Sequence, residues 1–150
     1  MASWKNFERK VAEEIANQWG FKYKEEVIRT PCSGGMKNFK GDVIVIGKEF
    51  PFHLEAKFGY DFVLEDIVKD KKNIKAFIKQ AEEDSPENKI PVVIASQPYY
   101  GRYVIIRKSR VIPEKIDFSV LSFFMLTTNY LVILLADLKK TYDMGVFNSV

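Results

Sequence analysis

Two acids and a lysine flank a short turn in the middle of the chain, within residues 41–57 (GDVIVIGKEFPFHLEAK). Two apolar runs on either side of a polar Gly-Lys-Glu turn predict a β-hairpin. Antiparallel counting across that turn brings Asp42 opposite Leu54 or Glu55. Lys57, two residues after Glu55 on the same strand, shares its face. The hairpin is therefore predicted to gather an Asp, a Glu and a Lys at its open end.

Carboxylates gathered in this way suit a divalent cation. Mg²⁺ prefers oxygen ligands, usually one or two carboxylates together with waters and substrate phosphate. A lysine beside the metal can orient an attacking water or stabilise the negative charge that develops on phosphorus. The chemistry indicated is metal-assisted hydrolysis of a phosphodiester.

A third acid lies in the helix predicted from about Ser3 to Trp19. Glu8 falls in the middle of the apolar stripe of that helix, where burial of an unpaired carboxylate is costly. Either it has a cationic partner, as a salt bridge or at the helix edge, or the helix face opens onto a polar site. In the second case Glu8 joins the two hairpin acids as a metal ligand.

The remaining sequence predicts helices and strands that could position these residues. The expected helices cover 3–19 and 62–83, with a short one from Asp137; the expected strands cover 21–30, the two arms of the hairpin, 90–96 and 103–107; apolar runs follow at 118–127 and 130–135. The first hairpin arm is apolar almost throughout, which favours burial on both faces. Periodicity does not separate helix from strand in the two last runs.

Composition favours one folded domain in a reducing compartment. The chain has 150 residues, 47% of them hydrophobic, and a net charge of only +3, which permits nucleic-acid binding without arguing for it. A lone Cys32 and a lone His53 exclude a disulfide framework and a Cys/His zinc cluster. His53 itself is expected to be a half-exposed strand residue. Residues 118–136 are long enough to cross a membrane, but the polar TTNY segment at their centre favours a loop between buried elements.

Two basic regions are candidates for binding phosphate. The Gly-rich loop at 31–42 carries Lys37 and Lys40 close to the acids, and its alternative is a flexible surface loop, since it lacks the P-loop pattern. A run of lysines at 69–79 is either a solvated helix face or a phosphate-facing surface.

An Asp at the start of one strand, followed across a hairpin by Glu-x-Lys, resembles the catalytic signature of the PD-(D/E)xK nuclease superfamily. A first helix carrying FER, a strand with VIR and a Ser/Gly loop before the Asp are similar to the archaeal and phage type of Holliday junction resolvase. The resemblance covers about the first 110 residues. This chain departs from the signature at Gly41, where the pattern has Pro.

The resemblance implies an α/β fold with a restriction-endonuclease-like central mixed β-sheet flanked by helices. It implies a single nuclease domain over residues 1–150, with a catalytic core at about 1–110 and a C-terminal extension at about 111–150. The implied catalytic residues are Glu8, Asp42, Glu55 and Lys57, of which Glu8, Asp42 and Glu55 would hold Mg²⁺, with Mn²⁺ as a possible substitute. The DNA-binding residues expected are Arg9, Arg29, Ser33, Lys37, Lys40 and Arg102.

The expected function is metal-dependent cleavage of branched DNA, most specifically resolution of four-way junctions in recombination and repair. A homodimer is expected because two-fold symmetry matches a junction, with the apolar segment 118–135 as part of its interface. The expected location is the cytoplasm, or the host cytoplasm for a viral protein. Two alternatives stay open: another endonuclease of the same fold, of restriction or repair type, and a non-catalytic DNA-binding or assembly protein whose acids are structural.

Overall fold

The computed structural model describes residues 4–30, 41–57, 63–97 and 101–148. Its strands are β1 (Val27–Arg29), β2 (Val43–Val45), β3 (Phe52–Lys57), β4 (Ile90–Gln97), β5 (Gly101–Arg107), β6 (Phe124–Leu126) and β7 (Tyr130–Leu134). In the described part of the chain they form one seven-stranded sheet in the order β1-β2-β3-β4-β5-β7-β6. Among these strands β3 and β4 run parallel, and the other neighbours are antiparallel.

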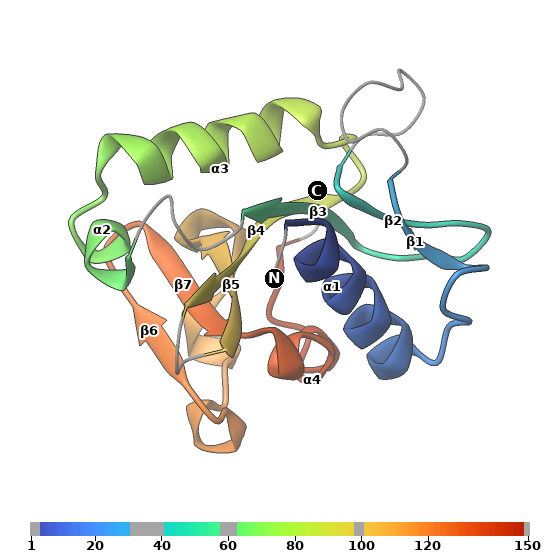
Figure 1. The fold of residues 1–150 in the computed structure, drawn as a ribbon. Coiled ribbons are helices and arrows are strands. Elements are labelled where there is room, and N and C mark those ends of the chain that lie inside the picture. Colours follow the sequence, from blue (N-terminus) through green and yellow to red (C-terminus); the bar gives the residue numbers. More distant parts are fainter. Residues whose placement is uncertain (1–3, 31–40, 58–62, 98–100, 149–150) are drawn as a thin grey trace.

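Helices cover both faces of this sheet (Figure 1). The α-helices are α1 (Trp4–Trp19), α2 (Leu64–Val68), α3 (Lys72–Asp84) and α4 (Leu138–Asp143). Helices α1 and α4 pack on one face, and α2 and α3 pack on the other, within the connection that joins the parallel strands β3 and β4. A parallel pair requires such a crossover. The predicted α/β class, with a central mixed sheet flanked by helices, is confirmed.

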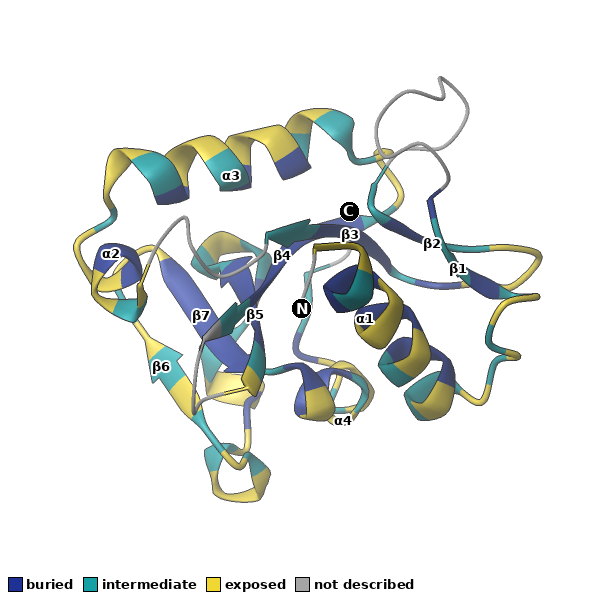
Figure 2. Ribbon diagram, viewed as in Figure 1, coloured by how far each residue is buried: buried dark blue, intermediate teal, exposed yellow. Residues whose placement is uncertain are grey.

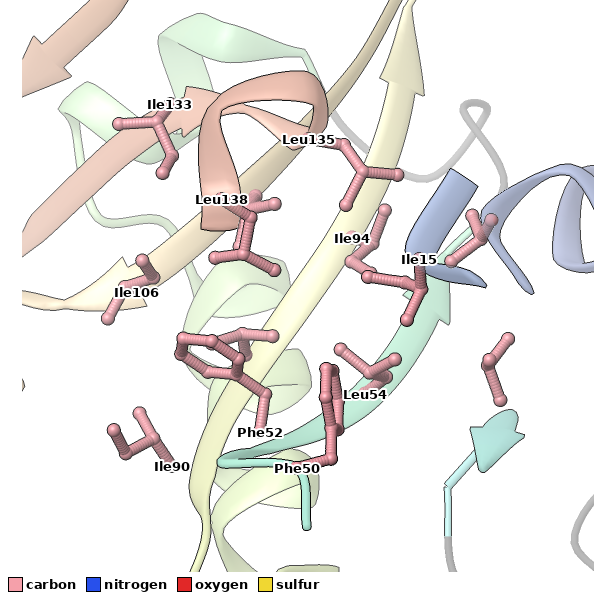
Figure 3. Packing of buried hydrophobic residues seen from close by; sticks show 14 of the residues in the cluster. Ile15, Phe50, Phe52, Leu54, Ile90, Ile94, Ile106, Ile133, Leu135 and Leu138 are labelled. Carbon is pink, nitrogen blue, oxygen red and sulfur yellow. The ribbon is translucent and has the colours of Figure 1, made fainter. Parts of the chain in front are cut away.

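Alternation along the strands creates two hydrophobic cores. On β4, Val92 and Ile94 join the core beneath α1 and α4, whereas Val93 and Ala95 join the core beneath α2 and α3. Figure 2 shows the central strands buried and the outer faces of the helices exposed. Figure 3 shows the first core from nearby, with Ile94 among the side chains between the sheet and the helices. The sheet is therefore a rigid support, packed on both faces, for the side chains at its edges.

Helix α1 agrees with its prediction. Its apolar stripe is buried at Phe7, Val11 and Ile15, and Glu8 is buried within that stripe at 5% exposure. Gly20 follows the helix with φ +71°, a left-handed conformation that commonly ends helices. The helix thus directs one carboxylate inward, as the sequence indicates.

Two predicted elements are shorter than expected. The strand predicted over 21–30 is reduced to Val27–Arg29, because Lys24 adopts φ +74° in a tight turn whose amides bond back to Lys22 and Val27. The helix predicted over 62–83 is divided by Asp70, at φ +51°, into α2 and α3. The first arm of the hairpin was predicted to be buried on both faces, but β2 is partly exposed after Val43.

The C-terminal apolar runs continue the sheet. Strand β7 pairs with β5 and is buried at its first four residues, while β6 pairs with β7 at the edge of the sheet. Before β6 the chain forms a short 3₁₀ turn, Phe118–Val120. Among the described residues, no helix has both the length and the apolar character needed to cross a membrane.

Candidate active site

The pairing of β2 with β3 decides which acids meet. Val43 lies opposite Leu54, and the backbone N–H of Asp42 donates to the carbonyl oxygen of Leu54 at 3.0 Å. One residue further along this antiparallel register, Asp42 faces Glu55, one of the two positions that sequence counting allowed. The Asp42 carboxylate also accepts a hydrogen bond from the backbone N–H of Ala56 at 2.8 Å. Asp42 is therefore held across the strand that carries Glu55.

Lys57 extends from the same face of β3 as Glu55, toward α3. Its Nζ donates to Oε1 of Gln80 at 3.1 Å and lies 5.0 Å from the centre of the Phe77 ring. Gln80 belongs to α3 and gave no signal in the sequence, because a glutamine on a helix surface is ordinary there. The structure shows that it holds the ammonium group of the predicted catalytic lysine.

Glu8 has the cationic partner that one interpretation of the sequence required. The Nε of Arg29 donates to Oε1 of Glu8 at 2.9 Å, and its guanidinium group lies 5.0 Å from the centre of the Trp4 ring. Burial raises the pKa of Glu8; Arg29 opposes this shift, and the negative charge of Glu55 adds to it. The salt-bridge interpretation is therefore confirmed, and a place for Glu8 in a polar site beside the helix stays a prediction.

Asp42 is the most perturbed acid of the site. Burial, and then the negative charges of Glu55 and Glu8, raise the pKa of Asp42 to about 7 from its ordinary value of 3.8. The two carboxyl groups of Asp42 and Glu55 also share a hydrogen bond, which favours the protonated form of Asp42. The site therefore concentrates more negative charge than its own cations balance.

This donor set fits a hard divalent cation. Two opposed carboxylates offer oxygen ligands, and a cation would relieve the repulsion that raises the Asp42 pKa. Across the described ranges, no three His, Cys, Asp or Glu side chains are gathered closely enough to hold a metal ion. The assignment of Glu8 as a third ligand stays a prediction, as do the roles of Asp42 and Glu55.

His53 differs from its sequence-based interpretation. It was expected to be half exposed, but its side chain is 3% exposed and its Nε2 lies 3.0 Å from Oε1 of Glu55. The prediction was wrong because β3 lies inside the sheet, between β2 and β4, so both of its faces are covered. The His-x-Glu alternation was the one signal that placed this ring beside the carboxylate.

The predicted DNA-binding residues occupy different settings. Arg29 is engaged by Glu8, and Arg102 donates to Glu14 of α1 through Nε at 3.1 Å and Nη2 at 2.7 Å. Arg9 is exposed on α1. Ser33, Lys37 and Lys40 lie outside the described residues. Contact of these six side chains with DNA stays a prediction.

The lysine run at 69–79 is matched by acids of its own surroundings. Ion pairs join Lys69 to Glu65, Lys71 to Asp66, Lys75 to Asp70 and Lys79 to Glu83. These pairs are largely exposed and each contributes little to stability. Their presence favours the solvated-face interpretation of this run over a phosphate-binding one.

A mixed sheet flanked by helices, with an Asp facing Glu-x-Lys across two strands, defines the PD-(D/E)xK class and its restriction-endonuclease-like fold. A family model described as "Phage putative PDDEXK endonuclease" matches residues 5–147, and the chain belongs to that family. The match runs well past residue 110 and includes the strands β7 and β6. In the same comparisons no curated protein and no solved structure matches the chain.

Gly41 shows why this chain departs from the Pro-Asp signature. Its φ is +91°, which the ring of a proline cannot adopt, and a Cβ there would lie 2.9 Å from the carbonyl oxygen of Leu54 and 3.1 Å from Cε1 of His53. A glycine at this position allows the chain before Asp42 to approach β3 closely.

We expect Gly41→Ala to destabilise the protein by about 2–4 kcal/mol, since it adds a steric clash to the cost of a left-handed backbone. The matched control is Gly47→Ala, at φ +70° with nothing within 4 Å of the added Cβ, which should cost about 1 kcal/mol from backbone strain alone. Denaturant unfolding measures both. Equal losses in the two variants would show that the close approach at Gly41 is unimportant.

The raised pKa of Asp42 predicts a pH-dependent stability in the metal-free protein. The folded state binds a proton more tightly than the unfolded state, so this group lowers the free energy of unfolding as pH rises from about 4 to about 7. In EDTA at pH 8, Asp42→Asn should therefore raise the free energy of unfolding by about 2 kcal/mol and flatten its pH profile. Glu87→Gln, which removes an exposed acid, is the control. An unchanged profile in Asp42→Asn would contradict the raised pKa.

Proposed function

We propose that this member of the phage PDDEXK endonuclease family is a metal-dependent DNA endonuclease that resolves four-way junctions. The observation that carries the proposal is the β2–β3 register, which sets Asp42 opposite Glu55 with Lys57 on the same face. Two acids and a lysine are unfavourable as a packed group, and their placement together is explained if all three act on one phosphate. The single nuclease domain would extend over the whole chain, including the strands of its C-terminal part.

In this proposal the two hairpin acids hold Mg²⁺, or Mn²⁺ in its place. When bound, such an ion polarises the phosphate and lowers the pKa of a bound water. The Asp42 carboxylate is held by the backbone N–H of Ala56, so this acid needs little reorganisation when DNA arrives. Glu8 is the third acid, and its exchange between Arg29 and the metal site would be a small movement of α1.

Lys57 supplies the positive charge nearest to the reacting group in this proposal. Its ammonium group is oriented by Gln80 and by the face of the Phe77 ring. A phosphate placed at the hairpin end would compete with Gln80 for its protons. Lys57 then stabilises the negative charge that builds up on phosphorus during hydrolysis.

Junction preference is supported by the likeness of the first helix and strand to junction resolvases. Arg9 is exposed on that helix, and Arg29 pairs in the sheet with Val43, the residue after Asp42. Lys37, Lys40 and Ser33, in the loop before Asp42, and Arg102 complete the proposed phosphate contacts. Such contacts read the shape of the backbone and not its bases, so binding should weaken steeply with salt. A phage family is consistent with action in the host cytoplasm.

The test is cleavage of a synthetic four-way junction compared with a linear duplex of the same arms, in Mg²⁺. We expect symmetric nicks in the junction and much slower cutting of the duplex. Glu55→Gln and Lys57→Ala should lower the cleavage rate by about 100-fold or more while junction binding in EDTA persists. Binding is measured by gel shift.

The control for these variants is Lys79→Ala, on the outer face of α3, which should cut at the wild-type rate. Equal cutting of junction and duplex would replace junction resolution by a general endonuclease activity. Unimpaired cleavage by Glu55→Gln would show that the hairpin is not the active site, and junction binding without cleavage by the wild type would favour a non-catalytic DNA-binding protein.

The proposed endonuclease would act as a homodimer through strand β6. This strand lies at the edge of the sheet and exposes Phe124 and Leu126, at 45% and 39% of their surface. An exposed apolar edge strand readily pairs with another chain. A second copy paired antiparallel along β6 would give the two-fold symmetry that matches two symmetric nicks.

Leu126→Lys should convert a dimer, with a mass twice 17.4 kDa, into a monomer, because a charge opposes edge-to-edge pairing. Ile46→Lys changes an exposed apolar residue near the opposite end of the sheet and should leave the mass unaltered. Size-exclusion chromatography with light scattering measures both. A monomeric wild type, or a Leu126→Lys dimer, would exclude this interface.

A further inference from the structure

The imidazole ring of His53 lies at the junction between the two strands that carry the hairpin acids. It leaves β3 from the same face as Glu55, and the two side chains are 3% and 5% exposed. Its Nε2 lies 3.0 Å from Oε1 of Glu55. An ionised carboxylate can only accept a hydrogen bond, so Nε2 of the ring is the donor in this contact.

The other edge of the same ring lies against the chain before Asp42. A Cβ built on Gly41 would be 3.1 Å from Cε1 and 3.5 Å from Nδ1 of His53. The ring therefore fills the space between the Glu55 carboxylate and the backbone that leads into Asp42. This contact depends on the absence of a side chain at Gly41, the position where the chain departs from the Pro-Asp signature.

We propose that His53 is a positioning residue that orients the Glu55 carboxylate for the divalent cation. The hydrogen bond engages Oε1 and limits rotation of the carboxylate, while the packing on Gly41 fixes the ring itself. Hydrogen-bonded partners of this kind commonly set the orientation of metal-binding carboxylates, and their loss weakens metal affinity by about 10–100-fold. The inference rests on the proposed function, because it takes Glu55 to be a metal ligand.

A purely structural role for His53 makes a different prediction. As a buried, satisfied polar side chain it would contribute to stability, and its replacement would lower stability equally with and without metal. A positioning role acts through the metal, so its loss would reduce the stability that the protein gains when it binds a cation. This gain in stability distinguishes the two roles, and it can be measured without any DNA cleavage.

The test compares three replacements of one side chain. His53→Gln keeps a donor at the same number of bonds from the backbone as Nε2, His53→Leu removes the donor, and His53→Asn places its donor too near the backbone. The first readout is the rise in melting temperature on adding Ca²⁺ or Mg²⁺ without DNA. The second is the Mg²⁺ concentration that gives half-maximal junction cleavage.

We expect His53→Leu and His53→Asn to need at least about tenfold more metal in both readouts, and His53→Gln to stay within about threefold of the wild type. If the Leu variant fails to fold, the Asn variant, which keeps a polar side chain, decides. A wild-type metal response in the folded Asn or Leu variant would overturn the proposal, as would failure of a folded Gln variant to restore it.

The outcomes also separate this inference from the proposed function. A wild-type chain whose melting temperature rises with metal but which cuts no DNA would overturn the endonuclease proposal, and the His53 variants would still be judged by the metal-induced shift. A wild-type chain with no metal-induced shift would overturn the positioning role itself, whatever its activity.

Discussion

The pairing of β2 with β3 is the constraint on which the candidate site depends. Because strands alternate their side chains, a shift of one residue would move Asp42 to a different partner and turn it to the other face of the sheet. The register is maintained by the apolar contacts of Val43 and Leu54 in the core and by the hydrogen bond from the Asp42 amide. Gly41 makes this register possible, because no side chain stands between it and β3.

This register has an electrostatic cost. Two carboxyl groups are held together near a third, and burial, followed by the negative charges of Glu55 and Glu8, raises the pKa of Asp42. Folded proteins tolerate such groups when the surrounding structure is stable enough to impose them. Here the central strands, packed on both faces, provide that stability. Unfavourable charge held in place by a well-packed sheet suits a site for a cation and a phosphate.

Helix α1 is attached to the sheet by charge as well as by its apolar stripe. Arg29 binds Glu8 in the N-terminal half of α1, and Arg102 binds Glu14 in its C-terminal half. Both arginines were expected to contact DNA, and both already have carboxylate partners within the chain. A phosphate contact at either arginine, as proposed, would compete with an existing ion pair. The Arg29–Glu8 ion pair thus both holds α1 on the sheet and sets the charge beside the candidate site.

The sequence by itself determined the elements with strong periodicity and the spacing of the acids and the lysine along the hairpin. The α1 stripe, the misplaced Glu8 and the Asp/Glu-x-Lys spacing were all legible, because helix and strand periods place residues on faces without knowledge of the rest of the chain. The α/β class followed from the resemblance carried by those same residues. The lengths of the elements were less well predicted. Lys24 and Asp70 interrupt two predicted elements by adopting left-handed conformations, which the sequence did not indicate at these positions.

Tertiary structure alone decided the environment of each functional group. Contacts between distant segments set Asp42 opposite Glu55, pair Arg29 with Glu8, place Gln80 beside Lys57 and bury His53. No local pattern encodes these contacts, because they follow from how the sheet orders its strands and which helices cover its faces. The sequence therefore determined which side chains could do chemistry, and packing decided their partners and their charge.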